Sequence, residues 1–585
     1  MDAARAPRWP LEPDAVASHW LDSGLLYSES SNLLLELQAT LLVLLTGFAV
    51  GAFAVGANYE ITDPKRSIIG ESQNAVIASS LKVGKCALLS ILPLPSHTGI
   101  CLHLVNQTSY TRRIGPRTSQ LQVFQMYELE WKTALGHPKE SAFSWYENDL
   151  AFLRLMPPWE VAEGVYSDFS IEVGSKSVFR IPMGPLKMTW EAEFTAYEPP
   201  HKFEDIMVRG PFWKWRHEHV FLDTESGSVV DDRVHYQVPF GALGHMFAGR
   251  WVRKRLRRMF RARELRLQRD MDRHAKYYDR PRKRILVAGS SGMIGTQLVA
   301  FLDTGGHDVW RLVRRPVTIG AKEIPWNPDR GELDASQIEG FDVIIHLGGA
   351  GIGDRRWSSK RKKIIRDSRV DSTALLADAV ASLDGGPEAF VLASAVGWYG
   401  NRADEELTEA STAGEGFLPD VCADWEGAAD AVEKSGVRTV YLRSGIVLSP
   451  TGGALGKMLL PFKLGIGGAI GGGKQWMPWI SLDDEIYAIY HLIMNEESRG
   501  PYNLTAPSPV RQKQFAKTLG GILRRPTIAP TPGLAIRLVF GEMGGNLALE
   551  SQRVLPERLR REDYQFVHED IEAALRDSMG IWREI

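Results

Sequence analysis

The chain shows two patterns of hydrophobic and polar residues, which change near residue 280. Between residues 121 and 240, apolar and polar side chains alternate in short runs such as "KMTWEAEFTAYEP" and "SVVDDRVHYQVPF". This period of two predicts successive antiparallel strands. From Arg284, "RILVAGSSGMIGTQLVAFLDTGGHDVWRLVRR" has an apolar run, a glycine turn, an amphipathic segment and a second apolar run. That order predicts a βαβ unit of a parallel sheet, so the chain combines two fold classes.

A long basic segment, "GHMFAGRWVRKRLRRMFRARELRLQRDMDRHAKY", follows the predicted strands. Its spacing predicts one helix with an apolar stripe against the sheet, formed by Phe247, Trp251, Leu256 and Phe260. The many arginines leave two interpretations open, a solvated outer face or a stripe that binds lipid or nucleic-acid phosphates. We expect residues 276–283 to be a polar, proline-containing linker.

Strands that close on one long C-terminal helix resemble the START-like, or polyketide-cyclase-like (SRPBCC), helix-grip family. The segments "HPKESAFSWYENDLAFLRLMPPWE" and "YQVPFGALGHMF" carry the resemblance, which covers residues 118–275. It implies an α+β domain that encloses an apolar small molecule between sheet and helix. Seven aromatic residues could line such a cavity or fill a core: Phe143, Trp145, Trp159, Trp190, Phe194, Trp213 and Trp215.

Three histidines, His217, His219 and His235, fall on the predicted strands. His217 and His219 share one strand face, as two metal ligands would. No accompanying carboxylate-plus-histidine spacing completes a site, and alternating polar residues on a half-exposed strand explain these histidines. We therefore expect no metal site.

Length, charge balance and cysteine content limit the number of domains, the class of partner and the cellular compartment. The 585 residues are enough for several domains, and 69 basic against 71 acidic residues give no argument for a nucleic-acid partner. Cys86, Cys101 and Cys422 form no CxxC pair and fit a reducing, cytoplasmic compartment. Within the unassigned region 1–117, the uncharged segment 37–59 is long enough to cross a bilayer. A membrane anchor and a buried glycine-rich helix remain alternatives for it.

The glycine turn after Arg284 predicts a dinucleotide site. Gly289 allows a tight turn, Gly292 lets the backbone approach a pyrophosphate, and Gly295 permits close packing of helix on sheet. The phosphates would face the amino end of the helix that Met293 opens. The expected backbone contacts are Gly289, Ser290, Gly292, Met293, Ile294 and Gly295.

The end of the second strand bears on which dinucleotide binds. An acidic residue there would bind the ribose 2′-hydroxyl, whereas cations favour a 2′-phosphate. The strand ends in Arg314 and Arg315, with no acid, so NADP(H) is preferred over NAD(H). The alternative is that both arginines only point into solvent.

Further motifs resemble the extended short-chain dehydrogenase/reductase (SDR) superfamily, and within it the atypical epimerase-like subgroup with the bacterial YfcH-type proteins. They are "FDVIIHLGGAGIG", "SAVGWYGN", "ADWEGAA", "GGGKQWMPWISLDD" and "SQRVLPERL". The resemblance implies a doubly wound Rossmann domain over 284–505 and a small C-terminal domain over 506–585. It adds cofactor contacts at Leu347, Gly348, Gly349 and Arg369.

The resemblance also implies a catalytic tyrosine–lysine pair, which this sequence lacks at the expected positions. SDR enzymes use a tyrosine with a lysine four residues later, and the family interval puts Val421 and Trp425 at those positions. Ser394 and Tyr399 remain as catalytic candidates. Two functions follow: an NADP(H)-dependent oxidoreductase or epimerase, or a catalytically degenerate regulatory protein of the kind labelled cell-division inhibitor.

Several acids near these motifs have simpler interpretations. Asp424 and Glu426, beside the lysine position, could supply a carboxylate to the site, but we expect them to be exposed helical acids. Asp483 and Asp484 stand at a predicted helix start, where carboxylates cap free backbone amides.

Overall fold

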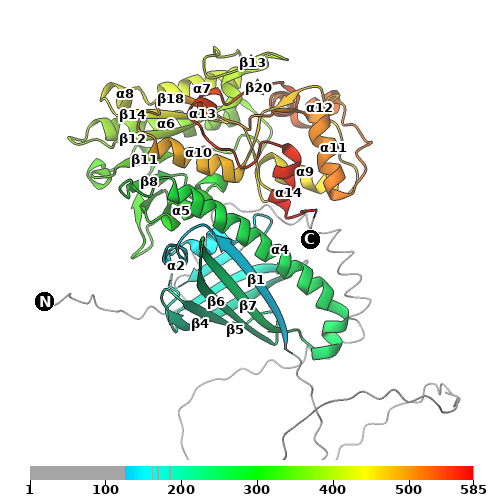
Figure 1. The fold of residues 1–585 in the computed structure, drawn as a ribbon. Helices are drawn as coiled ribbons and strands as arrows, with labels where there is room; N and C mark the ends of the chain where they lie inside the picture. Colours follow the sequence, from blue (N-terminus) through cyan, green and yellow to red (C-terminus); the bar gives the residue numbers. More distant parts are fainter. Residues whose placement is uncertain (1–125, 161–162, 168–169, 184–185, 584–585) are drawn as a thin grey trace, which may run out of the picture. The chain divides into compact units, whose positions relative to one another are not determined.

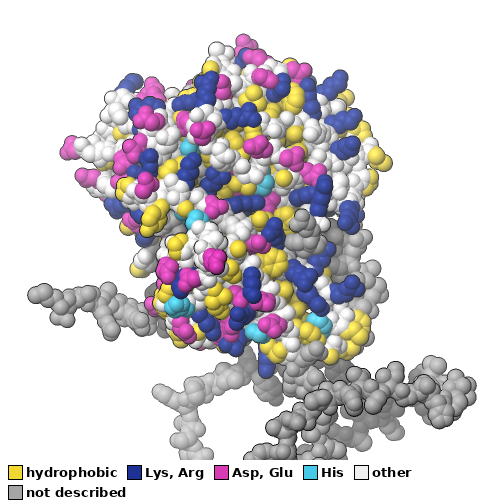
Figure 2. Space-filling view, in the orientation of Figure 1, with side chains coloured by type: hydrophobic (Ala, Val, Ile, Leu, Met, Phe, Trp, Pro, Cys, Tyr) yellow, Lys and Arg dark blue, Asp and Glu magenta, His cyan; other side chains and the backbone are white. Residues whose placement is uncertain are grey.

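The computed structural model describes residues 126–160, 163–167, 170–183 and 186–583, and residues 123–585 belong to one compact unit (Figure 1). The apolar segment 37–59 and the unassigned region 1–117 lie outside the described residues. In the part of the chain that is described, no helix has the length and apolar character needed to span a membrane. On the face drawn in Figure 2, cationic and anionic side chains are interspersed over the C-terminal half.

The first half of the described chain forms a seven-stranded antiparallel sheet in the order β1-β7-β6-β5-β4-β3-β2. Its strands are β1 (Tyr127–Leu135), β2 (Glu163–Ser167), β3 (Lys176–Met183), β4 (Leu186–Glu198), β5 (Lys202–Arg209), β6 (Lys214–Thr224) and β7 (Gly227–Gln237). Two helices, α2 (Lys139–Glu147) and α3 (Ala151–Leu155), connect β1 to β2. The period-two pattern does set the faces: Trp215, His217, His219 and Phe221 of β6 are all buried.

The long helix α4 (Gly241–Ala275) packs on β1, but its phase differs from the predicted stripe. Phe247 is 66% exposed and Trp251 is 53% exposed, whereas Leu256 and Phe260 are buried as expected. The buried face continues through Val252 instead. The prediction failed because it weighted large aromatic residues, while the side chains that reach the sheet follow the register of Val252, Leu256 and Phe260.

The second half forms a seven-stranded parallel sheet in the order β10-β9-β8-β11-β12-β14-β18. These strands are β8 (Arg284–Ala288), β9 (Asp308–Val313), β10 (Glu323–Pro325), β11 (Val343–His346), β12 (Ala389–Ala395), β14 (Arg438–Ser444) and β18 (Gly500–Leu504). The order reverses between β8 and β11, which is the switch point where doubly wound sheets bind ligands. The Rossmann expectation is confirmed.

Helices and short strands surround this sheet. The helices are α5 (Met293–Thr304), α6 (Ser359–Ala381), α7 (Phe417–Gly427), α8 (Asp430–Lys434), α9 (Gly453–Lys463), α10 (Leu482–Met494), α11 (Gln512–Leu523), α12 (Gly533–Gly544), α13 (Glu557–Arg561) and α14 (Ile571–Met579). The 3-10 turns η2 (Pro328–Arg330), η3 (Ala335–Ile338) and η4 (Val396–Tyr399) and the π-turn η5 (Gly545–Leu549) complete the helical elements. The short strands are β13 (Glu406–Leu407), β15 (Ile446–Leu448), β16 (Trp476–Met477), β17 (Trp479–Ser481), β19 (Val510–Arg511) and β20 (Arg553–Val554).

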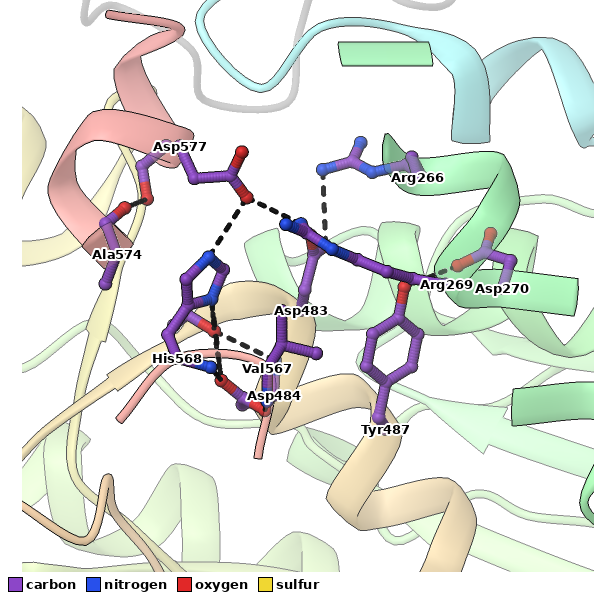
Figure 3. Close-up of polar contacts among 12 residues, drawn as sticks. Arg266, Arg269, Asp270, Asp483, Asp484, Tyr487, Val567, His568, Ala574 and Asp577 are labelled. Carbon is purple, nitrogen blue, oxygen red and sulfur yellow. Dashed lines mark hydrogen bonds and ion pairs between the residues drawn. The ribbon is translucent and has the colours of Figure 1, made fainter. Parts of the chain in front are cut away.

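Part of the basic face of α4 contacts the C-terminal half (Figure 3). Asp483 of α10 lies 3.2 Å from the Nη2 of Arg266 and 3.5 Å from the Nη1 of Arg269. Arg269 also lies 2.6 Å from Asp577 of α14. Neither a solvated face nor a phosphate-binding stripe describes these two arginines, because they form partly or fully buried ion pairs within the chain.

Asp484 also departs from its expected capping role. The hydroxyl of Ser481 caps α10, accepting the backbone N–H of Asp484 at 3.0 Å. The Asp484 carboxylate instead accepts the backbone N–H groups of Val567, at 2.7 Å, and His568, at 3.0 Å (Figure 3). The capping expectation was wrong because Ser481 satisfies the helix end, which leaves both acids to hold other segments.

Candidate functional site

The glycine turn lies at the switch point of the parallel sheet, where only glycine fits. Gly289 has a φ of 81°, and a Cβ there would lie 2.7 Å from the backbone nitrogen of Gly348. A Cβ on Gly295 would lie 2.2 Å from the carbonyl oxygen of Gly289. The loop after β8 and the loop after β11 are therefore in contact, and side chains are sterically excluded between them.

The amino end of α5 is open to a ligand. Among the described residues, no side chain caps this helix, whose N-cap is Gly292 in an extended conformation. Ser291 and Gly292 are exposed, and Ser290, Met293 and Ile294 are partly exposed. Free amides and the positive end of the helix dipole make this position suited to a phosphate group.

The turn Leu347–Gly349 contacts the glycine turn, and the side chain of Arg369 of α6 packs against Gly349. The guanidinium of Arg369 donates to the carbonyls of Ala350, at 3.0 Å, and Ile365, at 2.9 Å, and lies 4.9 Å from the ring centroid of Trp425. Burial lowers the pKa of Arg369 to about 10. Arg369 therefore positions the turn, and its direct contact with a cofactor stays a prediction.

The two arginines after β9 differ. Arg315 donates two hydrogen bonds to Glu323, at 2.9 and 2.6 Å, and one to the carbonyl of Pro316. Arg314 is exposed and has no hydrogen bond or ion pair with another described residue. Only Arg314 is thus available for an anionic ligand without first breaking an existing bond.

The two catalytic candidates lie in a buried polar network. The hydroxyl of Ser394, on β12, donates to Glu426 at 2.6 Å. Arg443, on β14, donates to both oxygens of Glu426, at 2.9 and 2.8 Å. Glu426 is only 8% exposed, so its interpretation as an exposed helical acid was wrong. Asp424, two residues earlier on α7, is exposed as expected and pairs with Arg366.

Tyr399, on η4, has no exposed surface. Its hydroxyl donates to the side-chain oxygen of Asn503 at 2.7 Å and accepts from Arg443 at 3.2 Å. Burial raises the pKa of Tyr399, which outweighs the opposing effect of Arg443. A proton held in this way is not available to a substrate unless the network opens.

Comparison with known proteins identifies the sequence family. The chain is 42% identical over 291 residues to the epimerase family protein Mb2239 of Mycobacterium bovis, of which it covers 96%. The chain belongs to the epimerase family. A model of the NAD dependent epimerase/dehydratase family matches residues 285–505, and a model described as a domain of unknown function, DUF1731, matches residues 531–578.

Other relatives of this epimerase-family chain include human SDR39U1, 37% identical over 297 residues that make up 50% of the chain and 99% of the relative. A crystal structure of human SDR39U1 with NADPH covers 50% of the chain and 98% of its own, at 35% identity and a TM-score of 0.46. The nucleoside-diphosphate sugar epimerase of Corynebacterium glutamicum covers 77% of this chain and 90% of its own, with 30% identity and a TM-score of 0.64. That share exceeds the C-terminal half, so the similarity extends into the preceding region.

In the epimerase-family chain, the positions expected for the SDR tyrosine and lysine are core positions. Val421 and Trp425 are both buried, and the indole N–H of Trp425 donates to the hydroxyl of Thr373 at 3.0 Å. The side chain of Trp425 belongs to the hydrophobic cluster on one face of the parallel sheet. The space that a catalytic pair would need is therefore filled.

Sequence reasoning missed Arg443 and Asn503, which complete the buried network. Arg443 interrupts the apolar strand "TVYLRSGIVL", and a charge inside a buried strand was a signal that a partner must exist. Asn503, in "GPYNLTAP", carried a weaker signal of the same kind.

A pocket lies between Asn401, two residues after Tyr399, and the C-terminal segment 537–550. Its polar side chains include a cation and two acids. The lining residues are Asn401, Arg537, Gly541, Glu542, Gly545, Asn546, Leu549 and Glu550.

Proposed function

We propose that the C-terminal half binds NADP(H) at the glycine turn. The open amino end of α5 would receive the pyrophosphate, and Leu347–Gly349 would form the opposite wall. The observation that carries the choice of NADP(H) over NAD(H) is Arg314, an exposed cation at the end of β9 with no partner among the described residues. The crystal structure of the human relative with NADPH supports the same choice.

We infer further that this half binds the cofactor without ordinary SDR acid–base catalysis. Tyr399 is fully buried and bonded on both sides, and the hydroxyl proton of Ser394 is held by Glu426. The tyrosine and lysine positions are occupied by buried Val421 and Trp425. A catalytically degenerate, NADP(H)-binding regulatory protein is therefore the function that this geometry supports best.

The second candidate is an NADP(H)-dependent oxidoreductase or epimerase that uses other groups. The pocket beside Asn401 favours it, since Arg537, Glu542 and Glu550 give this pocket a cation and two carboxylates. In that case the acid and base would come from the C-terminal domain rather than from η4 and α7.

One experiment separates the two candidates. NADPH and NADH are titrated against the purified chain, and NADPH oxidation is then followed with carbonyl compounds and sugar nucleotides. We expect saturable NADPH binding that is tighter than NADH binding, without substrate-dependent oxidation. Turnover that is lost in Glu542→Gln would favour the oxidoreductase or epimerase, and equal affinity for the two dinucleotides would contradict the NADP(H) assignment.

For residues 126–275 we propose a START-like domain that holds an apolar small molecule. The support is the order of elements, with α2 and α3 inserted after β1 and α4 closing on the sheet. The proposed ligand would have to lie among the aromatic side chains, although Phe143, Trp145 and Trp215 are already buried in core clusters and Trp213 is exposed. Native mass spectrometry of the purified chain tests this proposal, because a bound apolar molecule would add a defined mass and its absence after lipid supplementation would contradict the proposal.

A further inference from the structure

Four titratable side chains meet on the inner face of the antiparallel sheet. They are Asp205 of β5, His217 and His219 of β6, and Asp232 of β7. The strand register brings them together, because Asp205 is paired with His217 and His219 is paired with Asp232. The sequence shows no carboxylate-plus-histidine spacing here, because the two acids come from neighbouring strands. The explanation of His217 and His219 as polar residues on a half-exposed strand was wrong, since both are buried.

The polar atoms of this cluster converge. The Nδ1 of His217 lies 3.4 Å from an oxygen of Asp205, and its Nε2 lies 3.1 Å from Oδ1 of Asp232. The same Asp232 oxygen lies 2.6 Å from Nδ1 of His219. Asp205, His217 and His219 each offer a ligand atom, and these atoms all lie within 4.8 Å of one another.

The cluster is enclosed by aromatic rings. His219 stacks on Phe203 at 4.1 Å between ring centroids, and His217 meets Phe260 of α4 edge-on at 5.5 Å. Both histidines and Asp232 are buried. Charged groups in such an interior are costly unless they are paired or bind a metal ion. An apolar core would have satisfied the packing of this domain without them.

One contact within the cluster is close but poorly aligned. His219 Nδ1 is buried and lies 2.6 Å from an oxygen of Asp232, without the angle of a hydrogen bond. Two imidazoles and a carboxylate are a set that divalent first-row transition metals prefer. A further carboxylate that contacts both rings would fix their orientation, as acids behind metal-bound histidines commonly do.

We propose that Asp205, His217 and His219 bind one divalent first-row transition-metal ion, with Asp232 orienting the two imidazole rings. The site is independent of the dinucleotide site, because it lies within the antiparallel sheet. A buried ion-pair network with no metal is the competing explanation. If that explanation holds, adding metal leaves the stability of the chain unchanged.

Zinc binding to the full chain tests the proposal. The chain is stripped with a chelator and titrated with Zn²⁺ by calorimetry, and bound zinc is counted by elemental analysis after desalting. We expect about one tightly bound zinc ion per chain. His219→Ala and the nearly isosteric Asp205→Asn should abolish this binding, and Asp232→Asn should weaken it about 10- to 100-fold.

His235→Ala is the matched control. His235 is on β7 and pairs in register with Arg216. Three residues from Asp232 along the strand, it lies on the opposite face of the sheet from the cluster, so its substitution should leave zinc binding unchanged. Zn²⁺ should raise the melting temperature of the natural chain and of the control but not that of Asp205→Asn. The proposal is overturned if the natural chain binds no zinc, or if His219→Ala and Asp205→Asn retain the bound ion.

Discussion

The glycine turn and the Ser394–Glu426–Arg443 network belong to the same parallel sheet but are built in opposite ways. At the turn, backbone amides and the cation Arg314 are open to an incoming ligand. In the network, the principal polar groups already have a partner inside the protein, and Tyr399 is fully buried. In the proposed function, cofactor binding and acid–base catalysis are therefore separate properties of a Rossmann sheet. The cofactor site stays open while packed side chains occupy the positions of the catalytic pair.

The largest expected effect is on stability, when a lysine is placed at Trp425, the buried position where SDR enzymes carry their catalytic lysine. Trp425→Lys should lower the free energy of unfolding by about 3–5 kcal/mol or more, because it removes a buried aromatic side chain and buries a cation without a partner. Chemical denaturation measures the change. Trp213→Lys, at an exposed position, should stay within about 0.5 kcal/mol. A stable double variant Val421→Tyr/Trp425→Lys with carbonyl reductase activity would show that the packing is permissive.

Arg443→Met tests whether the Ser394–Glu426–Arg443 network stabilises the fold or contributes to NADPH binding. Removing one partner of a buried ion pair leaves Glu426 without its cation, which should lower the free energy of unfolding by about 3–5 kcal/mol. On the same helix as Glu426, Asp424→Asn breaks an exposed pair with Arg366 and should cost about 1 kcal/mol or less. NADPH affinity at a temperature where both variants are folded should be unchanged, and a selective loss of affinity in Arg443→Met would instead connect the two regions.

Gly295→Val tests whether the glycine turn binds the phosphates of the cofactor. A side chain here collides with the carbonyl of Gly289 and displaces the loop from the phosphates. Loss of two charge-assisted hydrogen bonds, at about 1.5–3 kcal/mol each, corresponds to a decrease in NADPH affinity of about 100-fold or more. Fluorescence titration measures the affinity. Gly385→Ala is the control, because a Cβ at this exposed position meets nothing within 4 Å.

The smallest effect concerns the choice of dinucleotide. Arg314→Ala should weaken NADPH binding about 10- to 100-fold and leave NADH binding nearly unchanged, since only NADPH carries the 2′-phosphate. The ratio of the two affinities is the measurement. Arg315→Ala should change this ratio less, because Arg315 is tied to Glu323. A larger change in Arg315→Ala would reverse the assignment.

The sequence predicted well those features that depend on local patterns. A short run of residues is enough to predict the strands β6 and β7 from their alternation, and the same holds for the glycine turn after β8. The phase of α4 was half wrong, because Val252 rather than Phe247 or Trp251 reaches the sheet.

The site chemistry was harder to predict because its partners are distant in the sequence. Ser394, Glu426 and Arg443 come from β12, α7 and β14, and no spacing links them. Glu426 and Asp424 look alike in the sequence, yet one is buried and the other exposed, since α7 presents them to different neighbours. The roles of Asp483 and Asp484 likewise depended on α4 and the chain near His568.

Helix α10 joins the antiparallel-sheet half to the parallel-sheet half, so the parallel-sheet half should not be stable alone. Its residues Asp483–Met494 are all buried, and Tyr487 bonds to Asp270 of α4 at 2.6 Å. Tyr490 and Phe301 of α5 pack with His274, near the end of α4. A shortened chain beginning at Arg284 would expose these rings and the carboxylate of Asp483 to water, so it should aggregate. The human relative matches only half of this chain and 99% of its own length, so we expect more polar residues on the corresponding surface.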